Sequence, residues 1–311
     1  MSQTKSGAEI AFPTTSPFVL RDAADTPATI EGRGRLFPPR GGGRAGVVIL
    51  PGLGGIVEAR EPRYGALLAA HGYAALACDS FGARGAGSAS LVRRALTVTE
   101  AMLAADACAA HRHLVDHAGV DPGRVAVLGF SYGGLSAVLL AYEQVARLFM
   151  PPGGPRFAAH VSCYGCSVAR LLEPATTGAP VRIAVGDRDG NVDLDHVRAI
   201  AGDLARGGSA VELDVLPGIR HQWDSEHARP TRVRPSPHRL RLEIDPENHV
   251  RDTRTGLRLR GPVSRGAVIA AHADWRGYDL LRDEAALAHT DAALLAFLDR
   301  ALGRRARAAA G

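Results

Sequence analysis

The sequence has no long apolar run. No window reaches the roughly 18 uninterrupted apolar residues that a membrane-spanning helix needs. Residues 1–18 also contain no apolar core of the kind that a secretory signal carries. These absences argue against a membrane protein, and we expect a soluble, cytoplasmic one.

Cysteine is scarce as well. Four cysteines in 311 residues are too few for a disulfide scaffold. Cys163 and Cys166 form a C-x-x-C pair at the end of an expected strand, and the chain holds no second pair. We therefore expect buried, reduced thiols here in place of a metal or redox site.

Lysine is nearly absent. Lys5 is the only lysine among 37 basic residues, and the arginines are scattered along the chain. A nucleic-acid-binding surface needs clustered positive charge, preferably with aromatic residues between the charges. The net charge of +5 therefore does not predict a nucleic-acid partner.

Strand-like and helix-like segments alternate along most of the chain, and 46% apolar residues are enough for a sizeable core. Short apolar segments predict strands over residues 45–50, 73–78, 125–128, 157–164, 181–185 and 211–216. Helical spacing of apolar residues predicts helices over residues 62–71, 97–117, 194–205 and 284–302. This alternation indicates an α/β protein whose mostly parallel sheet lies between helices and binds ligands at the carboxyl ends of its strands.

Two regions depart from the alternation. Residues 1–15 are expected to be a flexible lead, followed by an antiparallel pair over residues 18–21 and 28–37. Residues 228–275 are rich in arginine and proline, and their segments 240–244 and 255–259 alternate apolar with charged residues, which predicts a hairpin.

We interpret the chain as a single domain over residues 1–311. Its core covers about residues 16–227 and 276–303, its termini are flexible, and residues 228–275 are an insertion. The insertion is either a solvated decoration or a flap over an active site.

The segment 125–142, VAVLGFSYGGLSAVLLAY, contains the only G-x-S-x-G pentapeptide of the chain. Because an apolar strand precedes it and an amphipathic segment follows, the pattern predicts a sharp strand-to-helix turn that exposes the Ser131 hydroxyl above the sheet. Gly129 and Gly133 are needed where the backbone approaches its neighbours closely. Ser131 is therefore the candidate nucleophile.

A serine nucleophile needs a base and a carboxylate that orients the base. His221 follows the expected strand 211–216 and is the candidate base. The candidate acid is Asp189, with Asp187 as the alternative in the same GDRD loop. The order serine, acid, histidine is the one found when a G-x-S-x-G turn carries the nucleophile.

The remaining histidines fit a catalytic or metal site less well. His111, His113 and His117 lie on one expected helix without an acid or cysteine to complete a metal site, so we expect packed or solvated side chains. His227 and His238 lie close to or within the insertion, as does His249, and surface roles are expected for all three.

A serine enzyme also needs backbone N–H groups that stabilise an oxyanion. The N–H of Tyr132 and that of Leu53, in the segment PGLGG, are the candidates. The same glycine-rich loop could hold a dinucleotide, with Asp79 as a ribose ligand. However, Val57 stands where the third glycine of that motif belongs, and the dinucleotide interpretation leaves Ser131 unexplained.

The order PGLGG, GYAALACDSFGARG, GFSYGG, GDRD and GIRHQW resembles the dienelactone hydrolase family of α/β-hydrolases, over about residues 45–225 plus the final helix. The resemblance implies a nucleophile at Ser131, an orienting acid at Asp189, a base at His221, and oxyanion donors at Leu53 and Tyr132.

Two residues depart from the enzymes that name the family. Those enzymes carry cysteine at the nucleophile and glutamate where this chain has Gly52. The glutamate serves a resting thiol, so the two changes agree with each other and point towards general ester hydrolysis.

We therefore expect hydrolysis of a small carboxylic ester or lactone, without cofactor or metal, by a monomer or homodimer. Arg84 and Trp223 are candidate substrate contacts, with a structural loop anchor and a packing residue as the alternatives. Acyl transfer or cyclisation by the same three residues, and a non-catalytic ligand-binding protein, remain open.

Overall fold

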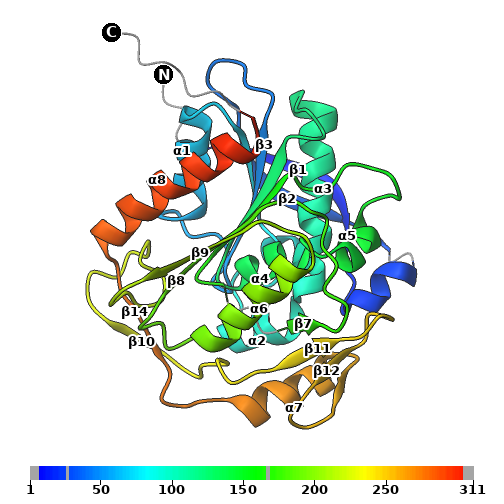
Figure 1. The fold of residues 1–311 in the computed structure, drawn as a ribbon, viewed down its shortest axis with the longest axis vertical. Coiled ribbons are helices and arrows are strands. Elements are labelled where there is room, and N and C mark those ends of the chain that lie inside the picture. The colour runs from blue at the N-terminus through cyan, green and yellow to red at the C-terminus, as the bar shows by residue number, and fades with distance from the viewer. Residues whose placement is uncertain (1–6, 26–27, 166–168, 304–311) are drawn as a thin grey trace.

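The computed structural model describes residues 7–25, 28–165 and 169–303. Its centre is an eight-stranded sheet with the strand order β1-β2-β4-β3-β5-β6-β8-β9 (Figure 1). The strands are β1 (Ala8–Thr15), β2 (Thr29–Phe37), β3 (Gly46–Leu50), β4 (Ala74–Cys78), β5 (Val125–Phe130), β6 (Ala159–Cys163), β8 (Val181–Gly186) and β9 (Val211–Leu216). Only the pairs β1–β2 and β2–β4 are antiparallel.

Helices cover both faces of this sheet. The helices of the described residues are α1 (Glu61–Ala70), α2 (Leu91–Thr97), α3 (Glu100–Ala118), α4 (Tyr132–Leu139), α5 (Glu143–Phe149), α6 (Leu194–Arg206), α7 (Pro262–His272) and α8 (Glu284–Ala301), with short 3-10 helices η1 (Leu20–Asp25) and η2 (Gly82–Arg84). In Figure 1, α1 and α8 lie on one face of the sheet, and α3, α4 and α6 lie on the other.

The core follows from the period-two geometry of the strands. Alternate residues of β3 point to opposite faces, so Val47 and Ile49 pack towards α1 and α8, whereas Val48 and Leu50 pack towards α3 and α4. These residues are all fully buried, as expected for a parallel strand covered on both sides. The predicted fold class is confirmed, and the predicted strands and helices of the alternating region are present close to their expected bounds.

The prediction for the N-terminal region is wrong in two respects. Residues 8–15 form β1 and pair with β2 along its whole length, from Ala8 opposite Leu36 to Thr15 opposite Thr29. Residues 20–25 form η1 and not a strand. β1 was missed because its buried residues, Phe12 and Thr14, are few and the rest of the strand is half-buried or exposed. The rest of the expected flexible lead, residues 1–6, and the expected flexible residues 304–311 lie outside the described part of the chain.

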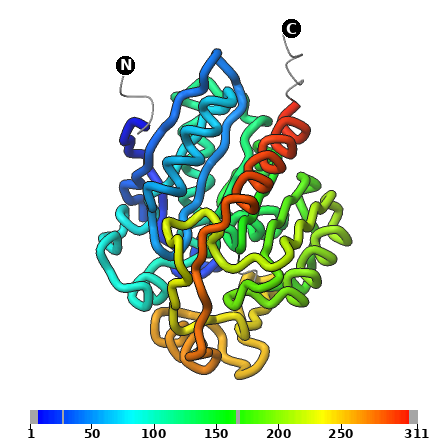
Figure 2. The backbone as a smooth tube through the Cα atoms, turned by 90° about the vertical axis from the view of Figure 1, so that its left-hand side faces the viewer, coloured from blue at the N-terminus to red at the C-terminus, as the bar shows by residue number. Residues whose placement is uncertain are grey.

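A smaller layer lies at one end of the molecule, where residues 240–275 gather in gold and orange in Figure 2. It contains a four-stranded sheet of order β13-β12-β11-β7, the helix α7, and a separate pair of strands, β10 and β14. The strands are β7 (Ala169–Leu171), β10 (Thr231–Val233), β11 (Leu242–Ile244), β12 (Val250–Asp252), β13 (Arg258–Leu259) and β14 (Tyr278–Leu280).

The predicted hairpin has different partners. β11 does not pair with β13, because β12 lies between them and is antiparallel to both. The turn from β11 to β12 has Asn248 at φ 65°, a left-handed conformation that asparagine tolerates better than most residues. On its other edge β11 pairs parallel with β7 of the core chain, so this small sheet joins segments that are far apart in sequence.

No helix among the described residues is long and apolar enough to cross a lipid bilayer.

Candidate active site

Ser131 lies on the turn between β5 and α4, at the carboxyl end of a central strand. Its backbone has φ 50° and ψ −110°, a strained conformation for a residue with a Cβ. A Cβ on Gly129 would lie 2.1 Å from the carbonyl oxygen of Gly133, and one on Gly133 would lie 2.5 Å from that of Leu50. The predicted close approach at both glycines is thus present, and it holds the serine at this turn.

The side chains of Ser131, His221 and Asp189 meet at the carboxyl ends of β5, β8 and β9. Ser131 Oγ lies 3.0 Å from His221 Nε2, and His221 Nδ1 lies 2.6 Å from Asp189 Oδ2. His221 is completely buried, and Ser131 and Asp189 are each 6% exposed. Because Nδ1 faces a carboxylate, the neutral imidazole carries its proton on Nδ1 and presents a free lone pair on Nε2 to the serine hydroxyl.

The alternative acid, Asp187, lies elsewhere. It is exposed, and its carboxylate accepts a hydrogen bond of 2.6 Å from the N–H of Gly218 in the following loop. Asp189 instead turns inward, and its second oxygen accepts the N–H of Asn191 at 2.8 Å. The structure therefore brings Asp189, and not Asp187, to the histidine.

Aromatic rings hold the imidazole of His221 in place. The rings of Tyr164 and Tyr278 each lie 5.1 Å from it, centroid to centroid, in edge-on geometry. The hydroxyl of Tyr164 donates to the fully buried carboxylate of Asp224, at 2.6 Å from the nearer oxygen. Burial raises the pKa of Asp224, although the positive charge of Arg60 and the bond from Tyr164 oppose this rise. Sequence reasoning missed Tyr164, whose position just after β6 is its only signal.

The two candidate oxyanion donors belong to the loop after β3 and to the start of α4. Tyr132 is the first residue of α4, so its N–H has no helical acceptor one turn earlier. Leu53 belongs to the loop after β3. Two buried arginines donate hydrogen bonds to the backbone of this loop. Arg94 donates to the carbonyl of Leu53 at 3.2 Å, and Arg60 donates to that of Gly55 at 3.3 Å. Leu53, Ser131 and Tyr132 line the same cavity.

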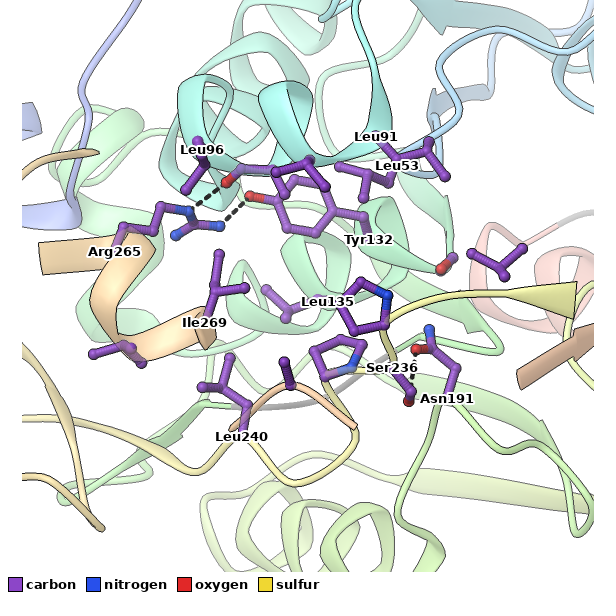
Figure 3. A pocket seen from close by; sticks show the side chains of 18 of the residues that line it. Leu53, Leu91, Leu96, Tyr132, Leu135, Asn191, Ser236, Leu240, Arg265 and Ile269 are labelled. Atoms are coloured by element: carbon purple, nitrogen blue, oxygen red, sulfur yellow. Dashed lines mark hydrogen bonds between the residues drawn. The ribbon is translucent and has the colours of Figure 1, made fainter. Parts of the chain in front are cut away.

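This cavity has a volume of about 170 Å³ and a mostly apolar wall. Figure 3 shows it between the core and the smaller layer. The core contributes Leu53, Leu91, Leu96 and Leu135, among others; residues 233–273 contribute the opposite wall, which includes Leu240 and Ile269. Residues 233–273 and Ser131 therefore line one cavity.

Two predicted substrate contacts do not line this cavity. The guanidinium of Arg84 is buried against the carboxylate of Asp106, at 2.7 and 3.0 Å, and also donates to the carbonyl of Thr15. The ring of Trp223 is fully buried, packs edge-on against Tyr164, and donates to Thr290 Oγ1 at 3.0 Å. Arg84 is thus a structural anchor and Trp223 a packing residue, the two alternatives that the sequence left open.

A buried ion pair at the cavity wall was not predicted. Arg265 of α7 donates to both carboxylate oxygens of Glu100, at 3.2 and 2.9 Å, and to the hydroxyl of Tyr132 at 2.8 Å. Burial opposes ionisation of Glu100, but the charge of Arg265 and the hydrogen bonds from Arg265 and Tyr132 outweigh it and lower its pKa. The partners are 165 positions apart in sequence, so no local pattern connects them.

The other predicted sites show packing and surface contacts. His113 stacks on His117 at 4.7 Å, and buried His111 packs edge-on against Phe157. Cys163 is buried, and burial raises the pKa of its thiol; its C-x-x-C partner, Cys166, lies outside the described residues.

One described group could hold a metal ion: the ligand atoms of Asp245, Glu247 and His249 lie within 4.8 Å of one another. Asp245 already accepts hydrogen bonds from the backbone and ring of His249, whose other ring nitrogen contacts Arg21. These bonds account for the cluster as part of a surface turn.

A mostly parallel sheet with a serine on a strained strand-to-helix turn, and a histidine and an aspartate on loops at the same edge, defines an α/β-hydrolase. The chain belongs to the dienelactone hydrolase family, whose model matches residues 33–236, and it is therefore a hydrolase. None of the curated proteins compared with it matches the sequence.

Solved structures share this fold. A dienelactone hydrolase-like promiscuous phosphotriesterase from metagenomic libraries superposes with a TM-score of 0.56 at 18% identity, over 94% of this chain and 99% of its own. A candidate dienelactone hydrolase from Klebsiella pneumoniae subsp. pneumoniae superposes with a TM-score of 0.52 at 20% identity, over 70% of this chain and 89% of its own. At these identities the likeness shows the fold alone.

Proposed function

We propose that this hydrolase cleaves a carboxylic ester or lactone through an acyl-enzyme formed on Ser131. The observation that carries the proposal is the continuous hydrogen-bonded line from the hydroxyl of Ser131 through the imidazole of His221 to the carboxylate of Asp189. We also propose that residues 228–275 are an insertion into a single hydrolase domain and form the roof of its active site.

In the first half of the reaction, Ser131 Oγ attacks the carbonyl carbon while Nε2 of His221 takes the hydroxyl proton. The carbonyl oxygen becomes an oxyanion, to which the N–H groups of Leu53 and Tyr132 donate. Asp189 stabilises the imidazolium that forms and keeps its ring oriented. Collapse of the intermediate breaks the bond to the alcohol oxygen, and His221 returns the proton to that oxygen.

In the second half, water replaces the alcohol. His221 removes a proton from the water as its oxygen attacks the acyl carbon, and a second oxyanion forms in the same place. Its collapse releases the carboxylic acid and returns the proton to Ser131. Each half moves one proton through Nε2, so no other acid or base is required.

The test is covalent labelling with a fluorophosphonate, followed by identification of the modified peptide. We expect one label, on Ser131, and a fall in kcat of about 10⁶-fold for aryl ester hydrolysis by Ser131→Ala. Ser162→Ala is a matched control, because Ser162 lies on the adjacent strand β6 and its buried hydroxyl has no hydrogen-bond partner among the described residues. Labelling of another residue, or a Ser131→Ala variant with full activity, would refute the proposal.

Product analysis with an added alcohol or amine separates hydrolysis from acyl transfer. We expect the free acid as the main product at all concentrations of the added nucleophile. A main product that carries the added alcohol or amine would contradict hydrolysis while keeping the acyl-enzyme.

A further inference from the structure

The cavity beside Ser131 has a mostly apolar wall, which limits the substrates that it can bind. On the basis of the proposed ester hydrolysis, we infer that the substrate is an uncharged ester with a large apolar group. This group would occupy the cavity that residues 233–273 enclose against the core. Three observations carry this inference: the cavity wall is mostly aliphatic, the charges of Glu100 and Arg265 in it are paired with each other, and the remaining charged residue, Arg234, is exposed.

Aliphatic side chains make up most of the cavity wall. Leu53 and Leu135 lie on the side of the core, and Ile269 of α7 lies opposite (Figure 3); Val268 of the same helix also lines the cavity. A substrate group that enters here leaves water for hydrocarbon, and each additional methylene gains affinity as long as space remains.

The charged groups inside the cavity neutralise each other. Of the described residues that line it, Glu100 and Arg265 are paired through two hydrogen bonds, and the hydroxyl of Tyr132 bonds to both. A substrate carboxylate would lie beside Glu100 and would compete with it for Arg265. It would lose its hydration without gaining an unpaired cation, which is costly in an apolar site.

Arg234 is the remaining charged residue of the wall, and it is exposed. Because Arg234 is exposed, an anionic group bound there would keep most of its hydration and gain little. This arginine makes the inference open to a direct test, since a preference for anionic esters that depends on Arg234 would contradict it.

The first experiment compares p-nitrophenyl esters of increasing acyl length, from acetate to decanoate, and acetate esters of increasing alcohol length. We expect kcat/KM to rise in at least one series, by about fourfold per methylene until the cavity is full. The charged comparison is p-nitrophenyl butyrate against the mono-p-nitrophenyl ester of succinate, which has a similar length and carries a carboxylate. We expect the carboxylate to lower kcat/KM by about 100-fold or more.

The second experiment fills the cavity from the roof. In Ile269→Trp the larger ring should fill part of the cavity, so kcat/KM for the longest favoured ester should fall by about tenfold or more relative to kcat/KM for the acetate ester. Ala270→Trp is the matched control, because Ala270 is the next residue of α7, is exposed, and does not line the cavity. This control should behave like the unmodified protein.

The outcomes separate the inference from the proposed function. Turnover of acetate esters with no rise along either series, or with equal or better turnover of the succinate ester, overturns the inference and leaves ester hydrolysis standing. If the succinate ester is preferred, loss of that preference in Arg234→Gln would assign the anion to the rim. Absence of both turnover and fluorophosphonate labelling would refute the proposed function itself.

Discussion

At the scale of single residues, the choice of the acid shows how little separates two candidates in a sequence. Asp187 and Asp189 lie two residues apart after β8. From the sequence, either carboxylate could bond to a loop backbone or to a histidine. The chain direction after the strand decides between them: the carboxylate of Asp187 turns to the N–H of Gly218, and that of Asp189 turns inward to His221.

Asp189→Asn should therefore impair the reaction far more than Asp187→Asn. An amide at position 189 disfavours the imidazole tautomer that the serine needs, and we expect kcat to fall by about 10⁴-fold. Asp187→Asn, the matched control in the same loop, should keep kcat within about threefold, because surface changes of this kind have small effects. Steady-state kinetics on an aryl ester, with thermal unfolding as a check of folding, measure both. Equal losses in the two variants would contradict this assignment.

At the scale of elements, the ion pair between Arg265 and Glu100 links the helix α7 to the core, in addition to the packing of Val268. Arg265 is its link to Glu100 at the start of α3 and to Tyr132 at the start of α4, and it also donates to the carbonyl of Ala95 at 2.6 Å. Three elements of the active-site region thus share one guanidinium. Because this pair is desolvated, removing one partner leaves an uncompensated charge.

Arg265→Met should loosen α7. Glu100 then keeps the hydrogen bond from Tyr132 but loses its cation, which costs up to about 3 kcal/mol, and the helix can relieve this cost by moving away from the core. We expect faster amide hydrogen exchange in α7 but not in α8, which packs on the other face of the sheet. The double variant with Glu100→Gln should recover part of the protection, since it removes the unpaired charge. Unchanged exchange in α7 of Arg265→Met would show that the ion pair does not hold the helix.

At the scale of the whole molecule, burial of histidines makes stability depend on pH. His160 is completely buried on β6, where its Nδ1 lies 2.9 Å from the carbonyl of Ala137, and His111 is buried on α3. Burial lowers the pKa of each from 6.5 to about 4. Between these values the unfolded chain binds protons that the folded chain does not.

The contribution of these two histidines is therefore fully present above pH 6.5 and decreases as the pH falls towards about 4. We expect the urea midpoint of unfolding to decrease over this interval. The decrease should be smaller in His160→Asn, once allowance is made for its lower midpoint at pH 7.5. His117→Asn, at an exposed histidine of α3, should keep the slope of the unmodified protein. A midpoint independent of pH from 7 to 4.5 would contradict this expectation.

The fold and the grouping of the three candidate catalytic residues were predictable because their signals are local. Fully apolar strands alternate with amphipathic helices, which predicts the sheet and its cover. A G-x-S-x-G pentapeptide directly after such a strand is typical of a serine nucleophile. His221 and Asp189 follow from the rule that parallel strands end at one edge, where side chains on successive loops come together.

What the tertiary structure alone decided depends on partners that are distant in the chain. Arg84 could have faced a substrate, and only the position of Asp106 on α3 turns it into a structural anchor. The pairing of β11 with β7 and of Arg265 with Glu100 ties the segment 228–275 to the core, so that residues 233–273 form one wall of the cavity beside Ser131. Periodicity in a sequence records which face of an element is buried. It does not record what that face is buried against, and the shape and charge of this cavity depend on those contacts.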